Sequence, residues 1–320
     1  MDNIRGGFFI VSNVLDVRVQ LPVEITPKLR LAKADDAQIS AIQSWLTAMS
    51  PGFVNPRSYY EKHWTTTVHS KTSSSTSPSP LERKDWRYYI LSFAGYGNET
   101  YDLFRAANLV EPGLNAFAQI YTTKEFGAGT VTGWGGDSVQ ALTAYEAPQS
   151  QILQTFDEAA VAELISCHRC LLGLDKSKHP GIERSVEVLQ RLKRISRGTD
   201  LRVLGLFAIL EMLLTHNPND KEIGDSLSHQ ISTKVPLLSA RFSSPLDYGC
   251  FEVGVTETTI WKRLYEYRSK IAHGELAEIN GRLSVLRSRE VATAFLEQAV
   301  RRVVRHALNE PALVDALKPI

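Results

Sequence analysis

Cysteine and long apolar runs are scarce in this sequence. Its 320 residues include three cysteines, too few for the disulfide framework of a small secreted domain. No charged segment followed by an apolar one begins the chain, so we expect a cytoplasmic protein. The longest nearly unbroken apolar run, 203–214, has 12 residues and contains Glu211. A membrane span needs about 20 apolar residues, so we expect no membrane role.

An excess of charge of either sign is also absent. Lys and Arg number 36 and Asp and Glu number 35, which leaves a net charge of +1. This balance excludes the composition of a general polyanion binder, so any nucleic-acid surface must be a local patch. Apolar residues make up 43% of the chain, enough to bury a core, and the length predicts two domains.

The first 150 residues carry patterns of strands and short helices. We expect strands at 17–25, 86–94, 114–122 and 139–147, a short helix that begins at Asp35 or Asp36, and another helix at about 100–109. Pro22 lies in the first of these strands and favours an edge position for it. Residues 1–150 are therefore predicted to form an α+β domain.

Two segments of this half have biased composition. Residues 70–80 are Ser, Thr and Pro with little apolar surface, which predicts a mobile loop. The glycine-rich stretch 126–136 raises the possibility of a phosphate-binding loop, but no Gly-Lys-Ser/Thr follows and the next segment has strand character. A hairpin or irregular turn is the favoured interpretation.

After Pro148 the apolar spacing changes from alternation to helical periodicity. This change predicts a boundary near residue 150, followed by an all-α helical bundle over 151–320. The expected helices cover about 157–173, 180–198, 200–214, 256–274 and 287–308, with a further helix from about 220 that is kinked or ends near Pro236.

The helix expected at 256–274 carries the residues most suited to chemistry. Within it, Arg268 is followed five positions later by His273. The spacing alone is not specific, because Arg301 and His306 repeat it. On an ideal helix, five positions separate two side chains by about 140°, so one straight helix does not bring them together. The pair can also be explained as an arginine and a histidine that interact with the last carbonyl groups of the helix.

The sequence around the pair supplies context. The segment 261–274 reads Trp-Lys-Arg-Leu-Tyr-Glu-Tyr-Arg-Ser-Lys-Ile-Ala-His-Gly, and the earlier segment 206–214 reads Leu-Phe-Ala-Ile-Leu-Glu-Met-Leu-Leu. Together with 222–242 they resemble the HEPN superfamily, particularly the Apea-like HEPN domains of prokaryotic antiviral systems. The resemblance covers about residues 150–310. It implies an HEPN helical bundle in which Arg268 and His273 are catalytic, with the polar Ser269 beside them.

That resemblance implies a metal-independent endoribonuclease without a cofactor, acting in antiviral defence or as a toxin. The two residue types suit the reaction, because an imidazole transfers protons near neutral pH and a guanidinium stabilises charge on a phosphate. Attack of a ribose 2′-hydroxyl on its own 3′-phosphate would leave a 2′,3′-cyclic phosphate and a 5′-hydroxyl. HEPN ribonucleases commonly pair two bundles, which implies a homodimer through the C-terminal bundle. Other HEPN domains are inactive interaction or RNA-binding modules, so this alternative stays open.

Further residues are candidates for supporting roles. Glu211 lies in the most apolar helix and needs a partner, so we expect it to pair with Arg268, although an open helix surface would also explain it. Ser269 and Lys270 are expected to support the catalytic pair. A basic stretch is a candidate RNA-binding surface or simply a solvated helix end; its residues are Arg191, Lys193, Arg194 and Arg197.

Two expectations concern metals and partners. Cys167 and Cys170 flank a histidine and an arginine like half of a metal site, but a convincing second half is missing, so they are interpreted as core thiols and no metal is expected. The domain at 1–150 carries no recognisable catalytic motif, and a toxic ribonuclease needs restraint. We therefore expect this domain to act in sensing or recognition, with RNA as the substrate and a regulatory protein as a possible partner.

Overall fold

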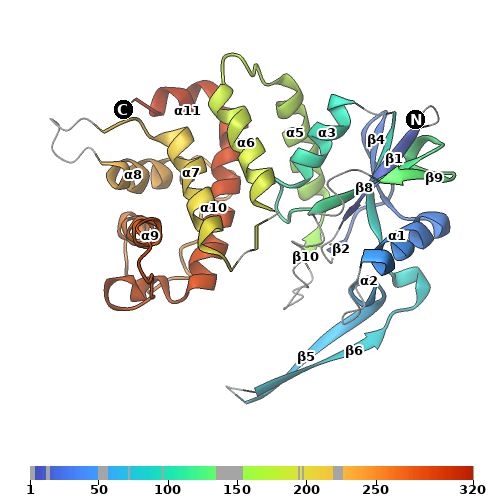
Figure 1. Ribbon diagram of the computed structural model, residues 1–320, viewed down its shortest axis with the longest axis horizontal. Helices are drawn as coiled ribbons and strands as arrows, with labels where there is room; N and C mark the ends of the chain where they lie inside the picture. Colours follow the sequence, from blue (N-terminus) through green and yellow to red (C-terminus); the bar gives the residue numbers. More distant parts are fainter. Residues whose placement is uncertain are drawn as a thin grey trace. The chain divides into compact units, whose positions relative to one another are not determined.

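The chain forms two compact units. A computed structural model describes residues 4–11, 15–49, 57–70, 73–95, 97–134, 154–193, 195–196, 198–218 and 226–319. The units comprise 1–168 and 169–320. The first has mixed α/β structure with an antiparallel sheet, and the helical region begins at residue 158 (Figure 1). This confirms the predicted succession of an α+β region and an all-helical region. The expected boundary near 150 lies outside the described residues, and the division into units falls within α5 (Glu158–Gly173).

A six-stranded sheet organises the first unit. Its spatial order is β3-β4-β7-β1-β8-β9, and every neighbouring pair is antiparallel. The strands are β1 (Gly6–Val11), β3 (Val23–Thr26), β4 (Leu29–Lys33), β7 (Tyr89–Ala94), β8 (Ala116–Thr122) and β9 (Val131–Trp134). The β8–β9 pairing confirms a hairpin at the glycine-rich segment, where a short 3-10 turn, η2 (Glu125–Gly127), connects the strands.

Successive side chains of β1 point to opposite faces of the sheet, and helices cover both faces. Phe8 and Ile10 belong to the core that includes the buried face of α1 (Asp36–Met49), whose residues are Ile39, Ile42, Trp45 and Leu46. Phe9 contacts Phe104 of α3 (Asn98–Ala107), with ring centroids 5.3 Å apart. The Asp35 side chain accepts a hydrogen bond from the Gln38 N–H at 2.8 Å, which confirms the predicted start of α1.

The strand expected at 17–25 is wrong in its continuity. Strand β2 (Leu15–Val17) ends at the first residue of this range and pairs in parallel with β10 (Gln154–Phe156), whereas β3 begins at Val23. Pro22 lies between the two strands, has no N–H to donate and follows a cis peptide bond. The expected edge position holds for β3, which is the outermost strand on its side of the sheet.

The loop expected at 70–80 is also wrong over most of its length. Residues Ser73–Pro80 form β6, which pairs antiparallel with β5 (Lys62–Ser70). The scarcity of apolar residues does not predict the structure of this segment, because backbone hydrogen bonds to a neighbouring strand can order a segment that has little apolar surface. In a two-stranded ribbon alternate N–H groups face solvent, so prolines two positions apart, such as Pro78 and Pro80, are tolerated. The strand expected at 139–147 lies outside the described residues.

The helices of the second unit surround α7 (Asp200–Leu214), as Figure 1 shows. The others are α6 (Pro180–Leu192), α8 (Leu227–Ser239), α9 (Glu257–Ala272), α10 (Arg289–Asn309) and α11 (Pro311–Leu317), with a 3-10 segment, η3 (Gly281–Leu286). Helix α7 contacts all five of the other α-helices, which explains why its sequence is apolar nearly all round. None of the helices in the described part of the chain is long and apolar enough to cross a membrane.

The end of α6 differs from the sequence prediction, and of the two alternatives at Pro236 an end of the helix is wrong. Helix α6 ends at Leu192, where the Arg202 guanidinium donates to the Leu192 carbonyl at 3.0 Å and to the Ile195 carbonyl at 2.5 Å. These bonds satisfy carbonyl groups that further helical turns would otherwise use. Helix α8 continues past Pro236 to Ser239. The segments η3 and α11 were not predicted.

We predict that Gly7→Ala destabilises the first unit. A Cβ at Gly7 would lie 2.1 Å from the Ile120 carbonyl oxygen of β8, and backbone cannot move aside as a side chain can. We expect a loss of about 1–3 kcal/mol in the free energy of unfolding, measured by urea denaturation of the full chain. Gly133→Ala is the matched control, since its Cβ would meet no atom within 4 Å. Equal stability of the Gly7→Ala and wild-type chains would contradict this close packing of β1 against β8.

Candidate functional site

An ion pair between Glu211 of α7 and Arg268 of α9 connects the two helices. The Arg268 Nη2 lies 3.0 Å from Glu211 Oε1 and 3.2 Å from Glu211 Oε2. The Tyr265 hydroxyl donates to Glu211 Oε1 at 3.2 Å. The predicted pairing of Glu211 with Arg268 is therefore present, and Tyr265 is an additional member that the sequence analysis missed.

Helical spacing explains why these side chains meet. Phe207 and Glu211 are four positions apart on α7, and Tyr265 and Arg268 are three positions apart on α9, so each pair shares one helix face. The Tyr265 ring meets the Phe207 ring edge-on, with centroids 5.7 Å apart. The Arg268 guanidinium carbon lies 5.4 Å from the Tyr265 ring centroid. The aromatic contact and the two polar bonds thus join the same pair of helices, α7 and α9.

Arg268 is held without being fully enclosed. Its Nε is buried and has no hydrogen-bond partner among the described residues, but 25% of the side chain is exposed. Glu211 is 20% exposed. A guanidinium has five N–H donors, so the bonds to Glu211 leave donors of Arg268 for an anion that approaches from solvent. The arrangement suits the binding of a phosphate oxygen.

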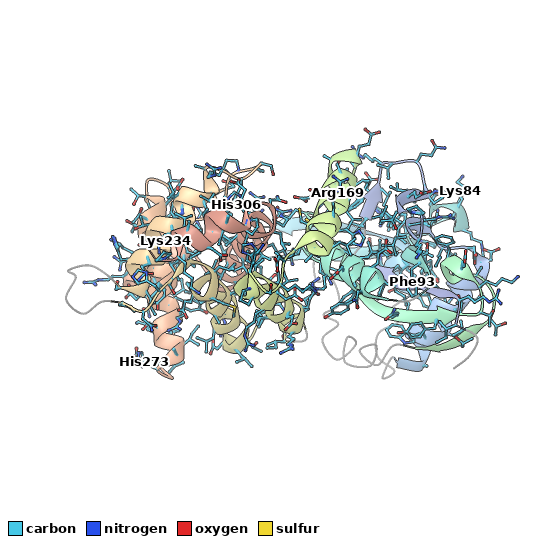
Figure 2. All side chains as sticks on the ribbon, turned by 90° about the horizontal axis from the view of Figure 1, so that it is seen from above. Lys84, Phe93, Arg169, Lys234, His273 and His306 are labelled. Atoms are coloured by element: carbon cyan, nitrogen blue, oxygen red, sulfur yellow. The ribbon has the colours of Figure 1, made fainter. Side chains whose placement is uncertain are left out.

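His273 occupies the C-terminal end of α9, where Gly274 turns the chain. Gly274 has φ +73°, and the Glu275 N–H donates to the Lys270 carbonyl at 3.0 Å while the Gly274 N–H donates to the Ile271 carbonyl at 3.0 Å. This pair of bonds is the Schellman motif, which requires a residue with positive φ. The His273 side chain is exposed at this end of the helix (Figure 2).

The structure of one chain does not join the two motif residues. Among the described residues, no hydrogen bond or ion pair connects the side chains of Arg268 and His273. The absence of such a contact agrees with the angle of about 140° that an ideal helix gives to a separation of five residues. Ser269 and Lys270 lie between them and are half-buried. Their carbonyl oxygens accept bonds from His273 and Glu275 and so help to form the helix end.

The candidate RNA-binding stretch lies at the end of α6. Arg191 is exposed and its Nη2 lies 3.7 Å from Glu187 Oε2, a distance at which an exposed pair contributes little to stability. Lys193 follows the helix and is half-buried. Arg194 and Arg197 lie outside the described residues.

The other Arg and His with the same spacing have different surroundings. Arg301 Nη2 lies 3.9 Å from Glu297 Oε2, and His306 is only 6% exposed. Burial lowers the pKa of His306, and its ring packs against Phe242 with centroids 5.5 Å apart. This pair is part of the packed bundle. In contrast, Arg268 and His273 both reach the surface.

The two cysteines around His168 have separate environments. Cys167 is buried, whereas the Cys170 thiol donates to Asn309 Oδ1 at 3.2 Å. In the described part of the chain, no group of three or more His, Cys, Asp and Glu side chains is arranged to hold a metal ion.

A pocket adjoins the ion pair on the Glu211 side. Its volume is about 450 Å³, and it is lined by Glu211, Thr215, His216, Asn217, Leu227 and Lys318. The sequence offered a signal for Tyr265, which lies one turn before Arg268. It offered none for His216 and Lys318, because they are about 100 positions apart in the chain.

Comparisons with protein-family models, with curated proteins and with solved structures found no match for this chain.

We predict that Tyr265→Phe weakens the dependence of stability on alkaline pH. Burial, followed by the nearby Glu211 carboxylate, raises the pKa of Tyr265 from 10.0 to about 12. The folded chain therefore keeps a phenol proton that the unfolded chain loses. The resulting stabilisation is complete below pH 10 and is lost as the pH rises through 12.

Urea denaturation at several pH values between 10 and 12 measures this effect. The stability of the Tyr265→Phe chain should fall less steeply than that of the wild type. Glu211→Gln should also reduce the slope, because it removes the negative charge that opposes ionisation of the phenol. Identical slopes in all three proteins would argue against the contact between Tyr265 and Glu211.

Proposed function

We propose that the helical unit is a metal-independent endoribonuclease of HEPN type, in which Arg268 and His273 are the catalytic residues. The observation that carries the proposal is the anchoring of Arg268. Glu211 binds the Nη2 of Arg268 and also accepts a hydrogen bond from Tyr265. Arg268 begins the Arg-x4-His pattern at the end of α9. A guanidinium held in this way is prepared to receive a phosphate, because little side-chain freedom is left to lose.

The reaction needs a group that removes a proton, a group that supplies a proton and a group that stabilises negative charge. The ribose 2′-hydroxyl loses a proton as its oxygen forms a bond to phosphorus, and the bond from phosphorus to the 5′-oxygen breaks as that oxygen gains a proton. The imidazole of His273 is suited to proton transfer, and Arg268 to stabilising the charge that accumulates on the phosphate oxygens. Glu211 acts as a positioning residue for Arg268. The products would be a 2′,3′-cyclic phosphate and a 5′-hydroxyl.

The spacing of the two residues favours a site completed by a second copy of the chain. An ideal helix places side chains five positions apart at about 140° to each other, and His273 is exposed at the helix end. Two bundles that meet at this end of α9 could place the His273 of one chain near the Arg268 of the other. A homodimer through the C-terminal bundle is therefore part of the proposal.

The remaining parts of the chain receive auxiliary roles in this proposal. The basic residues that the sequence offers as an RNA-binding stretch would contact RNA phosphates; they are Arg191, Lys193, Arg194 and Arg197. The α+β unit would regulate the nuclease or choose its substrate, because a ribonuclease must be restrained in the cell. The biological setting would be antiviral defence or a toxin-like activity in the cytoplasm.

A non-catalytic role is the second candidate. One observation favours it: the Arg268 guanidinium is already engaged by the Glu211 carboxylate, and His273 is not connected to it in a single chain. Such an arrangement would also serve an interaction or RNA-binding module that keeps the motif for structural reasons.

We predict that Arg268→Ala and His273→Ala each abolish RNA cleavage. His273 is exposed, so His273→Ala should not change stability, whereas Arg268→Ala removes the partner of Glu211 and should lower the stability of a chain that still folds, as circular dichroism can check. Cleavage of a mixed-sequence RNA by the purified full chain is measured in the presence of a metal chelator. We expect a loss of at least about 100-fold in rate for each variant, the usual scale for a group that transfers protons or stabilises charge.

Arg263→Ala is the matched control for Arg268→Ala. Arg263 also lies on α9, is 28% exposed and pairs with Glu266 at 2.7 Å, but it lies outside the proposed site. Its substitution should leave cleavage intact. Full activity in either catalytic variant, or cleavage by the wild type that needs a divalent metal, would refute the mechanism.

We predict that mixing the Arg268→Ala and His273→Ala chains restores activity. A mixed dimer with composite sites would contain one site in which both catalytic residues are intact. The activity of the mixture should approach a quarter of the wild-type value, since random exchange makes about half of the dimers mixed and each has one of two sites intact. Light scattering that detects an active monomer at assay concentration would contradict the composite site.

A further inference from the structure

The β5–β6 ribbon of the first unit is a sheet of only two strands. Strand β5 (Lys62–Ser70) pairs with β6 (Ser73–Pro80), and in the described part of the chain no third strand joins them. The ribbon extends from α2 (Ser58–Glu61), as Figure 1 shows. Each strand therefore has an outer edge at which its backbone N–H and C=O groups have no strand beside them.

The base of the ribbon is fixed to the rest of the first unit. The Glu61 carboxylate, directly before β5, accepts a hydrogen bond from the Tyr88 hydroxyl at 2.6 Å and another from Gln43 Nε2 at 2.8 Å. The Arg87 N–H donates to the Tyr60 carbonyl at 3.0 Å. Strand β5 therefore begins at a defined position, close to α1 and to the start of β7.

A hydrogen bond at this base shows which positions of the ribbon face outward. The Leu81 N–H donates to the Glu61 carbonyl at 2.8 Å, and the pairing continues in the same register from Lys62 opposite Pro80 to Val68 opposite Ser74. In an antiparallel pair, residues whose N–H and C=O groups face the partner strand alternate with residues whose groups face away from it. Positions 62, 64, 66 and 68 of β5 and positions 74, 76, 78 and 80 of β6 therefore turn these groups outward.

The two outer edges differ in their proline content. Pro78 and Pro80 occupy outward positions of β6, so this edge lacks two N–H donors that a further strand would need. Proline is one of the residues with which proteins block an edge strand. Strand β5 reads Lys-His-Trp-Thr-Thr-Thr-Val-His-Ser, which contains no proline and is rich in β-branched residues. The edge of β6 is thus closed to a further strand, and the edge of β5 is open to one.

The ribbon needs a further strand for its own stability. Two strands alone are marginally stable in water, because they bury little apolar surface. Apart from proline, the apolar residues of β5 and β6 are Trp64 and Val68. A second copy of the chain has the same need, and an antiparallel pair of identical strands around a two-fold axis satisfies both copies with the same residues.

We propose that β5 pairs with the β5 of a second copy of this chain, so that the two ribbons form one four-stranded sheet. The regular part of β5 runs from Lys62 to Val68, because its pairing with β6 becomes irregular after Val68. A two-fold axis at the centre of this part, Thr65, uses all four outward positions: 62 pairs with 68 of the other copy, and 64 with 66. Lys62, the one residue among Lys, Arg, Asp and Glu in β5, then does not face its own copy. This interface belongs to the first unit and depends neither on RNA cleavage nor on the dimer contact proposed for the bundle.

Cross-linking of single-cysteine substitutions tests the register in the full chain. In the proposed pairing the two copies of residue 65 lie opposite each other, with Cα atoms about 4.5 Å apart, which a disulfide can bridge. Thr65→Cys should therefore form a disulfide-linked dimer in oxidised glutathione, seen on a non-reducing gel. Thr67→Cys is the matched control, because two positions from the axis place its two copies about 13 Å apart. It should cross-link no more than the wild type, which reports the background from the native cysteines.

Proline substitutions at the two edges test which edge is used. Thr66 and Thr76 lie opposite each other in the ribbon, and each faces outward on its own edge. Added to Thr65→Cys, the change Thr66→Pro removes an N–H from the open edge and should lower the yield of cross-linked dimer by at least about tenfold. Thr76→Pro makes the same change on the edge that proline already blocks, and the yield should stay the same.

Three results would overturn the proposal. The first is a Thr65→Cys chain that cross-links no more than Thr67→Cys, and this comparison holds even if a proline disrupts β5. The second is cross-linking that survives Thr66→Pro. The third is a lack of cross-linking together with RNA binding that Thr66→Pro removes, which would make RNA the occupant of this edge. Each of these results leaves the proposed ribonuclease untouched, because RNA cleavage is measured separately.

Discussion

A carboxylate on the most apolar helix of the chain needs a partner, and this requirement governs how α7 meets α9. Glu211 is about one-fifth exposed, and leaving its charge unpaired there would cost free energy. Arg268 and Tyr265 meet the requirement from one face of α9. The same contact that stabilises the packing of the two helices also orients the guanidinium. The candidate site is therefore a consequence of satisfying a charge inside the bundle.

Long cationic side chains have a related structural role elsewhere in this unit. Arg202, Lys234 and Arg302 are each less than 10% exposed, and each donates to backbone carbonyl groups of another segment. Arg302 Nη1, for example, lies 2.7 Å from the carbonyl oxygens of both Ser244 and Pro245. Carbonyl groups at helix ends and in loops lack helical partners, and a buried cation satisfies several of them at once. These contacts hold the connections near α7, including the segment that positions His216.

Local sequence patterns predicted the elements whose stability depends on their own residues. The cap at Asp35, the apolar face of α1 and the position of Gly274 after α9 follow from capping chemistry and helical periodicity. The β5–β6 ribbon did not follow, because its strands are stabilised by each other's backbone and their Ser and Thr side chains carry no burial signal. The early end of α6 did not follow either, since Arg202 satisfies its last carbonyl group from ten positions along the chain.

For the candidate site, the sequence by itself determined the spacing of Arg268 and His273, the need of Glu211 for a partner and the succession of an α+β region and a helical region. Periodicity and charge are local properties, so they can be read without coordinates. Only the tertiary structure decided that Tyr265 shares Glu211 with Arg268, that His273 is exposed at the end of α9 and that His216 lines the adjoining pocket. The reason is physical: these relations depend on which faces of α7, α8, α9 and the C-terminal segment pack together, and packing joins residues that are about 15 to 100 positions apart.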